Sequence, residues 1–226
     1  TGIGKTLGYL IPAALYLERN STHKIVIATS TKNLQAQIQD KDWPLIERRF
    51  PNIKIATLKG KSNYICHRAL ARQYSHYMGA GSTWQEKAAW IYMVLFSHET
   101  EGDLERIPYG IKHWLKPIFN LIQDIRADKH CTKSLCVPEE CVYGKHLLNA
   151  KAAQIIITNH HKAALLSPDI LDCSRALIID EAEKFGDNVR HALSITIKSG
   201  DIRRLLNRIN GTPKRKGFLQ IIKGVL

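Results

Sequence analysis

The chain has 226 residues, of which 44% are hydrophobic and 23% are charged, so neither disorder nor a coiled coil explains it. No run approaches the roughly 20 consecutive apolar residues that span a bilayer, and Thr1 begins no signal sequence, so we expect a soluble cytoplasmic protein with no membrane partner. Lysine and arginine total 33 against 20 acidic residues, a net charge of +13 that favours a polyanionic partner such as nucleic acid.

The first six residues, TGIGKT, form the end of a P-loop, G-x-x-x-x-G-K-[ST], whose first glycine would precede the chain. In such a loop Gly2 and Gly4 let the backbone approach phosphate, Lys5 reaches the β and γ phosphates, and the Thr6 hydroxyl ligates Mg²⁺. A helix is predicted to follow directly over residues 5–17. Because the motif is cut, we expect a fragment of a longer protein.

Short runs rich in β-branched residues predict buried parallel strands, and a helix over residues 32–38 joins the first two of them. The predicted strands cover residues 25–28, 53–58, 155–158 and 176–179. Strands that alternate with helices in this way predict an α/β fold with a parallel P-loop sheet.

About ninety residues separate the second and third predicted strands, too many for a bare loop, so we predict an inserted subdomain. Apolar spacing within it predicts helices over residues 84–96 and 111–125. Beyond the sheet, residues 202–209 have helical spacing and Gly211 ends the pattern. The last 29 residues hold eight bases and one acid, which makes that end a candidate contact surface.

The fourth predicted strand ends in two adjacent carboxylates, Asp180 and Glu181. In P-loop enzymes an aspartate at such a strand end holds Mg²⁺, and a neighbouring glutamate can activate the attacking water. Together with the P-loop, this pair predicts ATP hydrolysis, with Lys5, Asp180 and Glu181 as the catalytic residues.

Four cysteines inside the insertion are spaced C-x64-C-x4-C-x4-C, at Cys66, Cys131, Cys136 and Cys141. A cytosolic nucleotide enzyme is not expected to carry disulfides, so these thiols favour a metal or cluster. One distant cysteine followed by a trio suits an iron–sulfur cluster better than zinc, which prefers two tight pairs, and unreactive buried thiols are the third interpretation. Cys173 lies outside the insertion, and we expect it to be a buried thiol.

These motifs together resemble those of the iron–sulfur superfamily 2 DNA helicases, the DinG and XPD group, with the bacterial DinG branch most similar. The resemblance rests on the P-loop remnant, IATST at 27–31 followed by LQAQ at 34–37, LKGKSNYIC at 58–66, the cysteine trio, TNHH at 158–161 and DEAE at 180–183.

The resemblance implies an enzyme that couples ATP hydrolysis to 5′ to 3′ movement on single-stranded or forked DNA in repair or replication, with a [4Fe-4S] cluster. It implies a RecA-like motor domain at residues 1–65 and 146–190, the cluster subdomain at 66–145 and a truncated, basic, Arch-like helical domain at 191–226. As a fragment without the second motor half, the chain alone is expected to be a poor ATPase and no helicase.

The same resemblance supplies a DNA track whose residue types suit the role. Hydroxyl groups at Thr29, Ser30 and Thr31 follow a strand, where they can hold a DNA phosphate. Charge and a stacking ring come from Lys59, Lys61 and Tyr64, as in grooves that bind single strands. Asn159 and His160 follow the third strand at the mouth of the sheet. For the lysines and the tyrosine an ordinary solvated surface is the alternative.

One position departs from the family, because the box that begins at Asp180 usually ends in histidine and here ends in Glu183. This change puts in doubt the coupling of hydrolysis to movement rather than hydrolysis itself. Two alternatives to a helicase therefore stay open. The first is a catalytically degenerate cluster protein that binds DNA, and the second is a DinG-like protein with a nuclease at its N-terminus.

Overall fold

The structure is a computed structural model, which describes residues 4–127, 131, 137, 140–195, 197, 199–212, 215–217, 219 and 223. The chain divides into two compact units, Thr1–Ala192 and Leu193–Leu226. In the described part of the chain, no helix is long and apolar enough to cross a membrane. Gly2 and Cys136 lie outside the described residues.

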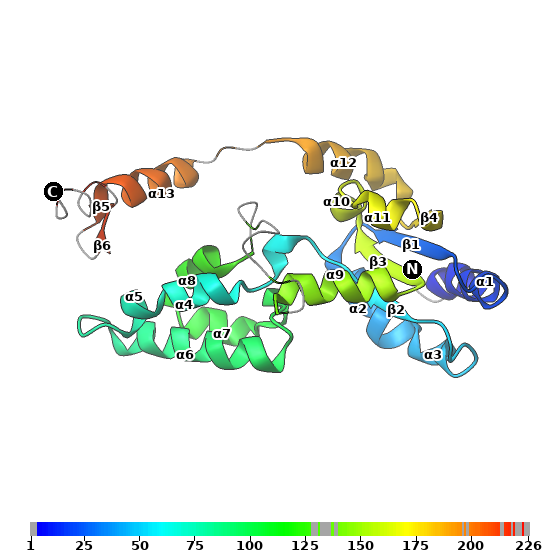
Figure 1. Cartoon of the computed structure of the whole chain (residues 1–226), viewed down its shortest axis with the longest axis horizontal. Helices are drawn as coiled ribbons and strands as arrows, with labels where there is room; N and C mark the ends of the chain where they lie inside the picture. The colour runs from blue at the N-terminus through cyan, green and yellow to red at the C-terminus, as the bar shows by residue number, and fades with distance from the viewer. Residues whose placement is uncertain are drawn as a thin grey trace. The chain divides into compact units, whose positions relative to one another are not determined.

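A parallel sheet forms the centre of the first unit, with its four strands in the order β2-β3-β1-β4 (Figure 1). The strands are β1 (Lys24–Thr29), β2 (Ile55–Thr57), β3 (Ile155–Asn159) and β4 (Ser174–Ile179). In register, Ile27 of β1 lies between Ile157 and Ile178. The predicted α/β class and its parallel sheet are therefore confirmed.

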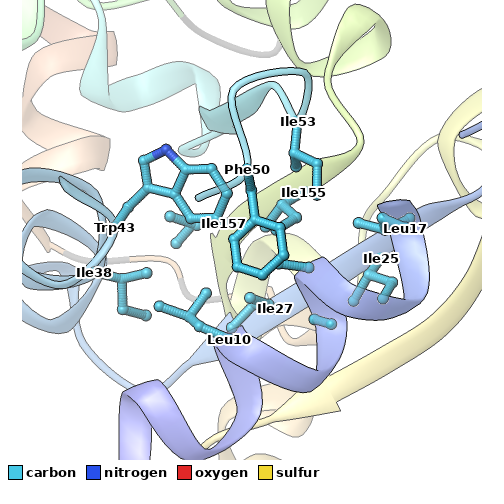
Figure 2. Close-up of a cluster of buried hydrophobic side chains, with 12 residues drawn as sticks. Leu10, Leu17, Ile25, Ile27, Ile38, Trp43, Phe50, Ile53, Ile155 and Ile157 are labelled. Atoms are coloured by element: carbon cyan, nitrogen blue, oxygen red, sulfur yellow. The ribbon is translucent and has the colours of Figure 1, made fainter. Parts of the chain in front are cut away.

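One face of the sheet is covered by α1 (Lys5–Arg19), α2 (Lys32–Gln37), a π-helical turn (Ile38–Asp42) and α3 (Pro44–Glu47). Alternate strand residues point to this face because side chains in a strand have a period of two. Figure 2 shows the resulting core, in which isoleucines of β1 and β3 pack against leucines of α1 and the rings of Trp43 and Phe50.

The opposite face is covered mainly by α9 (Val142–Ala152) and α11 (Pro168–Leu171). Its core contains the intervening strand residues Val26 and Ile156, together with Leu58, Ala150 and Ile170. Because helices cover both faces, β1 is buried except at Lys24, β3 is buried throughout, and each strand contains a continuous apolar run.

Between β2 and β3 the chain forms a separate group of helices, drawn in cyan and green in Figure 1. They are α4 (His67–Arg72), α5 (Tyr74–Met78), α6 (Trp84–Glu99), α7 (Tyr109–Trp114) and α8 (Pro117–Ile125). Their own core includes Met93, Leu121 and Ile125, all fully buried. Thr83 and Glu86 begin α6 with a capping box. The inserted helical unit, as we call residues 66–127, thus has a core of its own.

Two expectations about these elements were wrong in detail. The apolar pattern over residues 111–125 is two helices, because Pro117 has no backbone N–H to continue α7 and instead opens α8. Strand β4 is not buried, and Leu177 is 47% exposed. The cause is that β4 pairs only with β1 among the described residues.

The second unit contains α13 (Ser199–Asn210) and a short antiparallel pair, β5 (Gly211–Thr212) and β6 (Arg215–Lys216). The helix predicted over residues 202–209 is confirmed, and it ends at Gly211 with φ of 86°, a left-handed conformation that favours glycine.

Candidate active site

The P-loop remnant leads directly into α1. Gly4, at the N-cap of α1, has φ of 108° and ψ of −26°, a backbone conformation that favours glycine. Lys5 is the first helical residue and is exposed, whereas Thr6 is only 8% exposed and faces the body of the unit. The described part of the loop thus leaves Lys5 open to a ligand at the N-terminus of a long helix.

Asp180 lies against this helix, although it is far from it in sequence. The carboxylate oxygen Oδ2 of Asp180 accepts a hydrogen bond from the Tyr9 hydroxyl over 3.2 Å. Thr6 lies about one turn before Tyr9 on the same helix, and its side chain acts to lower the pKa of the Tyr9 phenol. Burial and the negative charge of Asp180 raise the pKa of the Tyr9 phenol, so the hydroxyl stays a donor. Tyr9 therefore links the two residues predicted to ligate Mg²⁺, and no sequence motif pointed to it.

Glu181 follows in a left-handed backbone conformation, with φ of 54° and ψ of 50°. Its backbone N–H donates to Asp180 Oδ1 over 3.0 Å. On its side chain, Oε2 accepts a hydrogen bond from the Ser30 hydroxyl and forms an ion pair with Lys184 Nζ at 3.1 Å. The Ser30 hydroxyl and then Lys184 hold the pKa of the Glu181 carboxyl below its usual value.

His160 is fully buried behind these carboxylates. Its Nε2 donates to the backbone carbonyl of Asp180 over 2.9 Å, and the Asn188 amide donates to Nδ1 over 3.0 Å. The ring also meets the ring of Phe185 edge to face. His160 thus supports the Asp180 strand end and connects it to α12 (Phe185–Leu193), whereas sequence reasoning had placed it on the DNA track.

The hydroxyl segment after β1 is only partly accessible. Thr29 is fully buried, with its hydroxyl donating to the Thr31 carbonyl, and Thr31 caps α2 by accepting from the Leu34 N–H. Ser30 is half-buried and Thr31 is exposed. Asn159 is also a cap, because its side-chain oxygen accepts from the Lys162 N–H at the start of α10 (His160–Ala163). Of these residues, Ser30 and Thr31 are placed to meet a ligand.

The structure gives Lys59 and Tyr64 roles that do not fit the predicted DNA contacts. Lys59 Nζ is held by Asp103 Oδ2 at 2.6 Å and Glu105 Oε2 at 2.8 Å, and its side chain is 11% exposed. Tyr64 is 1% exposed, its hydroxyl accepts from the Lys59 N–H, and its ring packs against Tyr143. A DNA strand can reach neither a buried ion pair nor a buried ring. The spacing of the motif does not reveal that these side chains are buried.

Lys61 is the member of that motif that remains half-exposed. Its Nζ lies 6.0 Å from the centre of the Tyr143 ring, and Lys162 Nζ lies 5.9 Å from it. Burial raises the pKa of the Tyr143 phenol and lowers the pKa of the Lys162 ammonium. Tyr143 and Lys162 thus accompany Lys61 here, and sequence reasoning had missed both.

Three of the four predicted cluster ligands are described, and all three are half-buried. Cys66 precedes α4 and Cys141 precedes α9. Their neighbours Ile65 and Val142 both pack around Gly102, which has φ of 67° and leaves no room for a side chain. Cys131 joins this region through its carbonyl, which accepts from Lys61 Nζ at 3.4 Å. Within the described residues, however, no group of three or more His, Cys, Asp or Glu side chains is close enough to hold a metal.

Glu183 and Cys173 are both exposed. Glu183, where the resembling family has histidine, lies on a 3₁₀ turn (Ala182–Lys184). The expectation that Cys173 is a buried thiol was wrong, because this residue precedes the exposed strand β4.

The sheet and this site together indicate the class of domain that the chain forms. A parallel α/β sheet, with a Gly-Lys-Thr helix start linked through Tyr9 to an aspartate at a strand end, is consistent with a RecA-like domain. No family model matches the chain.

Comparison with curated proteins then identifies related chains. The chain is 26% identical over 216 residues to the ATP-dependent DNA helicase DinG of Escherichia coli K12, covering 87% of this chain and 29% of that protein. It is 31% identical over 234 residues to the 3′-5′ exonuclease DinG of Bacillus subtilis 168, covering 97% of this chain and 23% of that protein. The chain therefore has a DinG-like relationship, and it spans less than a third of the length of these relatives.

Proposed function

We propose that this chain is the first motor half of an ATP-dependent DNA helicase that moves 5′ to 3′ on single-stranded or forked DNA. The observation that carries the proposal is the link from Thr6 through Tyr9 to Asp180, because it brings the predicted Mg²⁺ ligands of two distant motifs to one place. The name of the Escherichia coli relative supplies the activity. The net charge of +13 supports a nucleic-acid partner.

In this proposal MgATP is the substrate and the chain's residues divide the work. The backbone at Gly2 and Gly4 and the Lys5 ammonium bind phosphates, while Thr6 and Asp180 ligate the magnesium ion that accompanies ATP. Glu181 orients and deprotonates the attacking water. The phosphoryl group passes to that water and ADP leaves.

For the DNA track, the accessible groups are Ser30, Thr31 and Lys61. Hydroxyls and a lysine are donors that hold phosphates without regard to sequence. The other residues predicted on the DNA track lie beneath this surface, and we assign them the role of fixing the segments that carry the accessible groups. They are Thr29, Lys59, Tyr64, Asn159 and His160. That division follows burial, since Thr29 and His160 are fully buried and Tyr64 is 1% exposed.

For the cluster, the thiols of Cys66, Cys131, Cys136 and Cys141 would hold a [4Fe-4S] group. The donor set is chemically suitable, and the packing of Ile65 and Val142 around Gly102 brings the chain near Cys66 close to the chain near Cys141. When bound, such a group supplies a rigid crosslink among four segments of chain. The residues themselves would fix the entry and exit of the inserted helical unit.

A second candidate function rests on the relative from Bacillus subtilis, which is named an exonuclease. In that case the whole protein carries a nuclease outside these residues. A nuclease assay on the whole protein and on Lys5→Ala separates the two activities, because a nuclease elsewhere keeps working when the P-loop is disabled. The degenerate-motor alternative, motivated by Glu183, requires that the unmodified whole protein hydrolyse no ATP.

The proposal is tested by Lys5→Ala and Glu181→Gln in the whole protein. We expect Lys5→Ala to abolish ATP turnover while single-stranded DNA binding is retained, and Glu181→Gln to bind ATP without hydrolysing it. Lys41→Ala is the matched control, because Lys41 is an exposed lysine on the π-helical turn. An ATPase rate for Lys5→Ala within about twofold of the unmodified protein contradicts the P-loop assignment.

The cluster is tested separately by purification without oxygen. We expect a brown protein with iron and acid-labile sulfide in equal amounts, and loss of colour in Cys66→Ser and Cys141→Ser. Cys173→Ser, an exposed thiol outside the insertion, is the control that keeps the colour. Zinc without labile sulfide would show the cluster assignment to be wrong.

A further inference from the structure

Ser30 belongs to two predicted surfaces at once. It lies in the hydroxyl segment after β1 that is proposed to meet DNA, and its hydroxyl donates to Oε2 of Glu181, the residue proposed to activate water. The two residues are 151 positions apart in sequence. They meet because β1 and β4 are neighbours in the sheet, with Ala28 paired to Ile179, so that both strands end at the same edge.

A serine hydroxyl has a single hydrogen to donate. In the structure that hydrogen is given to Glu181. A DNA phosphate offers only acceptor oxygens, so a phosphate held by the Ser30 hydroxyl must take the hydrogen away from Glu181. The two hydrogen bonds are therefore mutually exclusive.

Two further contacts keep Glu181 in its present position. Lys184 Nζ approaches the same oxygen, Oε2, at 3.1 Å, and the Glu181 N–H donates to Asp180 Oδ1. The backbone of Glu181 is left-handed, with φ of 54°, a conformation that costs a glutamate free energy which contacts in the folded protein offset. Loss of the Ser30 bond removes one of these constraints.

We propose that Ser30 is a positioning residue that engages Glu181 in the absence of DNA and releases it when a DNA phosphate takes the hydroxyl. The inference rests on the proposed function and adds the regulation of the same site. Without DNA, the side chain of Glu181 is occupied and hydrolysis is slow. With DNA, Glu181 is free to turn to the water, so DNA stimulates turnover.

The experiment measures ATP turnover by the whole protein with and without single-stranded oligothymidylate. For Ser30→Ala we expect the rate without DNA to rise roughly three- to tenfold, the effect of losing one hydrogen bond to a charged group at a half-exposed site. The ratio of the rates with and without DNA should fall toward one. Ser30→Thr keeps a hydroxyl and should restore the DNA-free rate and the ratio.

Lys184→Met is the matched comparison, because it removes the ion pair to the same oxygen of Glu181, Oε2, but keeps the Ser30 hydroxyl that DNA is proposed to take. We expect a higher DNA-free rate with DNA stimulation retained. If Ser30 only supported folding, Ser30→Ala would change the ATPase rates with and without DNA by the same factor. DNA stimulation would then not distinguish Ser30→Ala from Lys184→Met.

The outcomes distinguish this inference from the proposed function. If the unmodified whole protein shows no DNA-stimulated ATPase, the proposed function is wrong. If it does, and Ser30→Ala has a lower or unchanged DNA-free rate, then Ser30 does not restrain Glu181 and only the present inference is overturned.

Discussion

Tyr9 joins the two halves of the proposed nucleotide site. Its hydroxyl donates to Asp180 at the end of β4, and Tyr9 lies on α1 near Thr6 and one turn beyond Lys5. A hydrogen bond to a ligating carboxylate fixes which oxygen faces the metal, and loss of such a bond commonly costs about tenfold or more in metal affinity.

We therefore expect Tyr9→Phe to raise the Mg²⁺ concentration that gives half-maximal ATPase by about tenfold in the whole protein. The maximal rate at saturating Mg²⁺ should change less. Tyr16→Phe is the control, because Tyr16 is on the same helix and its hydroxyl is hydrogen-bonded to His23 over 2.8 Å, away from the carboxylates. Identical Mg²⁺ dependence in the two variants would show that Tyr9 is only a packing residue.

At this scale the sequence identified reactive groups but not their neighbours. Lys5, Asp180 and Glu181 could be proposed from the sequence because a P-loop ends in Gly-Lys-Thr and a strand-end carboxylate pair is typical of P-loop enzymes. Tyr9 and His160 could not be assigned, since their roles depend on hydrogen bonds formed only when β4 lies beside β1. A tyrosine on a helix and a histidine after a strand have many other uses.

An ion-pair network that is buried at Lys59 and Asp103 joins the sheet to the inserted helical unit. Lys59, just after β2, pairs with Asp103 and Glu105, and Glu105 also pairs with Lys32 at the start of α2. Burial acts to lower the pKa of Lys59, but hydrogen bonds to Asp103 and Glu105 outweigh it and the pKa is raised. The network thus connects three elements, with Lys59 and Asp103 largely buried and Lys32 44% exposed.

Replacing Lys59 with methionine keeps an unbranched side chain without the charge and leaves Asp103, which is 7% exposed, without its cation. We expect Lys59→Met to lower the free energy of unfolding by about 3 kcal/mol, the usual cost of removing one member of a buried pair. Lys54→Met is the control, since Lys54 is an exposed lysine at the edge of β2. Denaturant titration measures both, and equal stability of the two variants would contradict a structural role for Lys59.

The same network predicts a pH dependence through Glu105. Burial acts to raise its pKa, but hydrogen bonds from Lys32 and Lys59 outweigh it and hold the pKa below the ordinary 4.5. A carboxyl with a lower pKa in the folded state stabilises the fold above its unfolded value, and that contribution disappears as pH falls. The difference in stability between the unmodified protein and Glu105→Gln should therefore be constant near neutrality and shrink below about pH 4.5. If the difference in free energy of unfolding between the two proteins stayed constant down to about pH 3, this predicted role of Glu105 would be refuted.

At the scale of elements the sequence predicted more. The apolar runs within β1 and β3 indicated buried parallel strands, because continuous apolar runs are typical of strands covered on both faces. Sequence reasoning failed where a single residue or a missing neighbour decides the outcome. Pro117 divided one periodic pattern into α7 and α8, and β4, paired on one side only among the described strands, is exposed at Leu177.

For the whole molecule, positive charge is uneven along the chain. The second unit, Leu193–Leu226, holds eight lysine and arginine residues and one acid, more than half of the net charge of +13. Salt dependence reports how many phosphates a protein neutralises, because each neutralised phosphate releases counterions from the DNA. The contribution of this unit to the proposed DNA binding is therefore measurable without knowing its contacts.

We expect removal of residues 193–226 to weaken single-stranded DNA binding and to make the plot of log affinity against log salt shallower, by about 0.7 for each phosphate that is no longer neutralised. Removal of a purely structural unit would lower affinity at every salt concentration and leave the slope unchanged. The control neutralises three exposed bases of the first unit that lie outside the proposed DNA track, Lys41, Arg48 and Lys54, each changed to glutamine. If that control reduces the slope and the deletion does not, the DNA follows the first unit alone, and the basic second unit serves another partner.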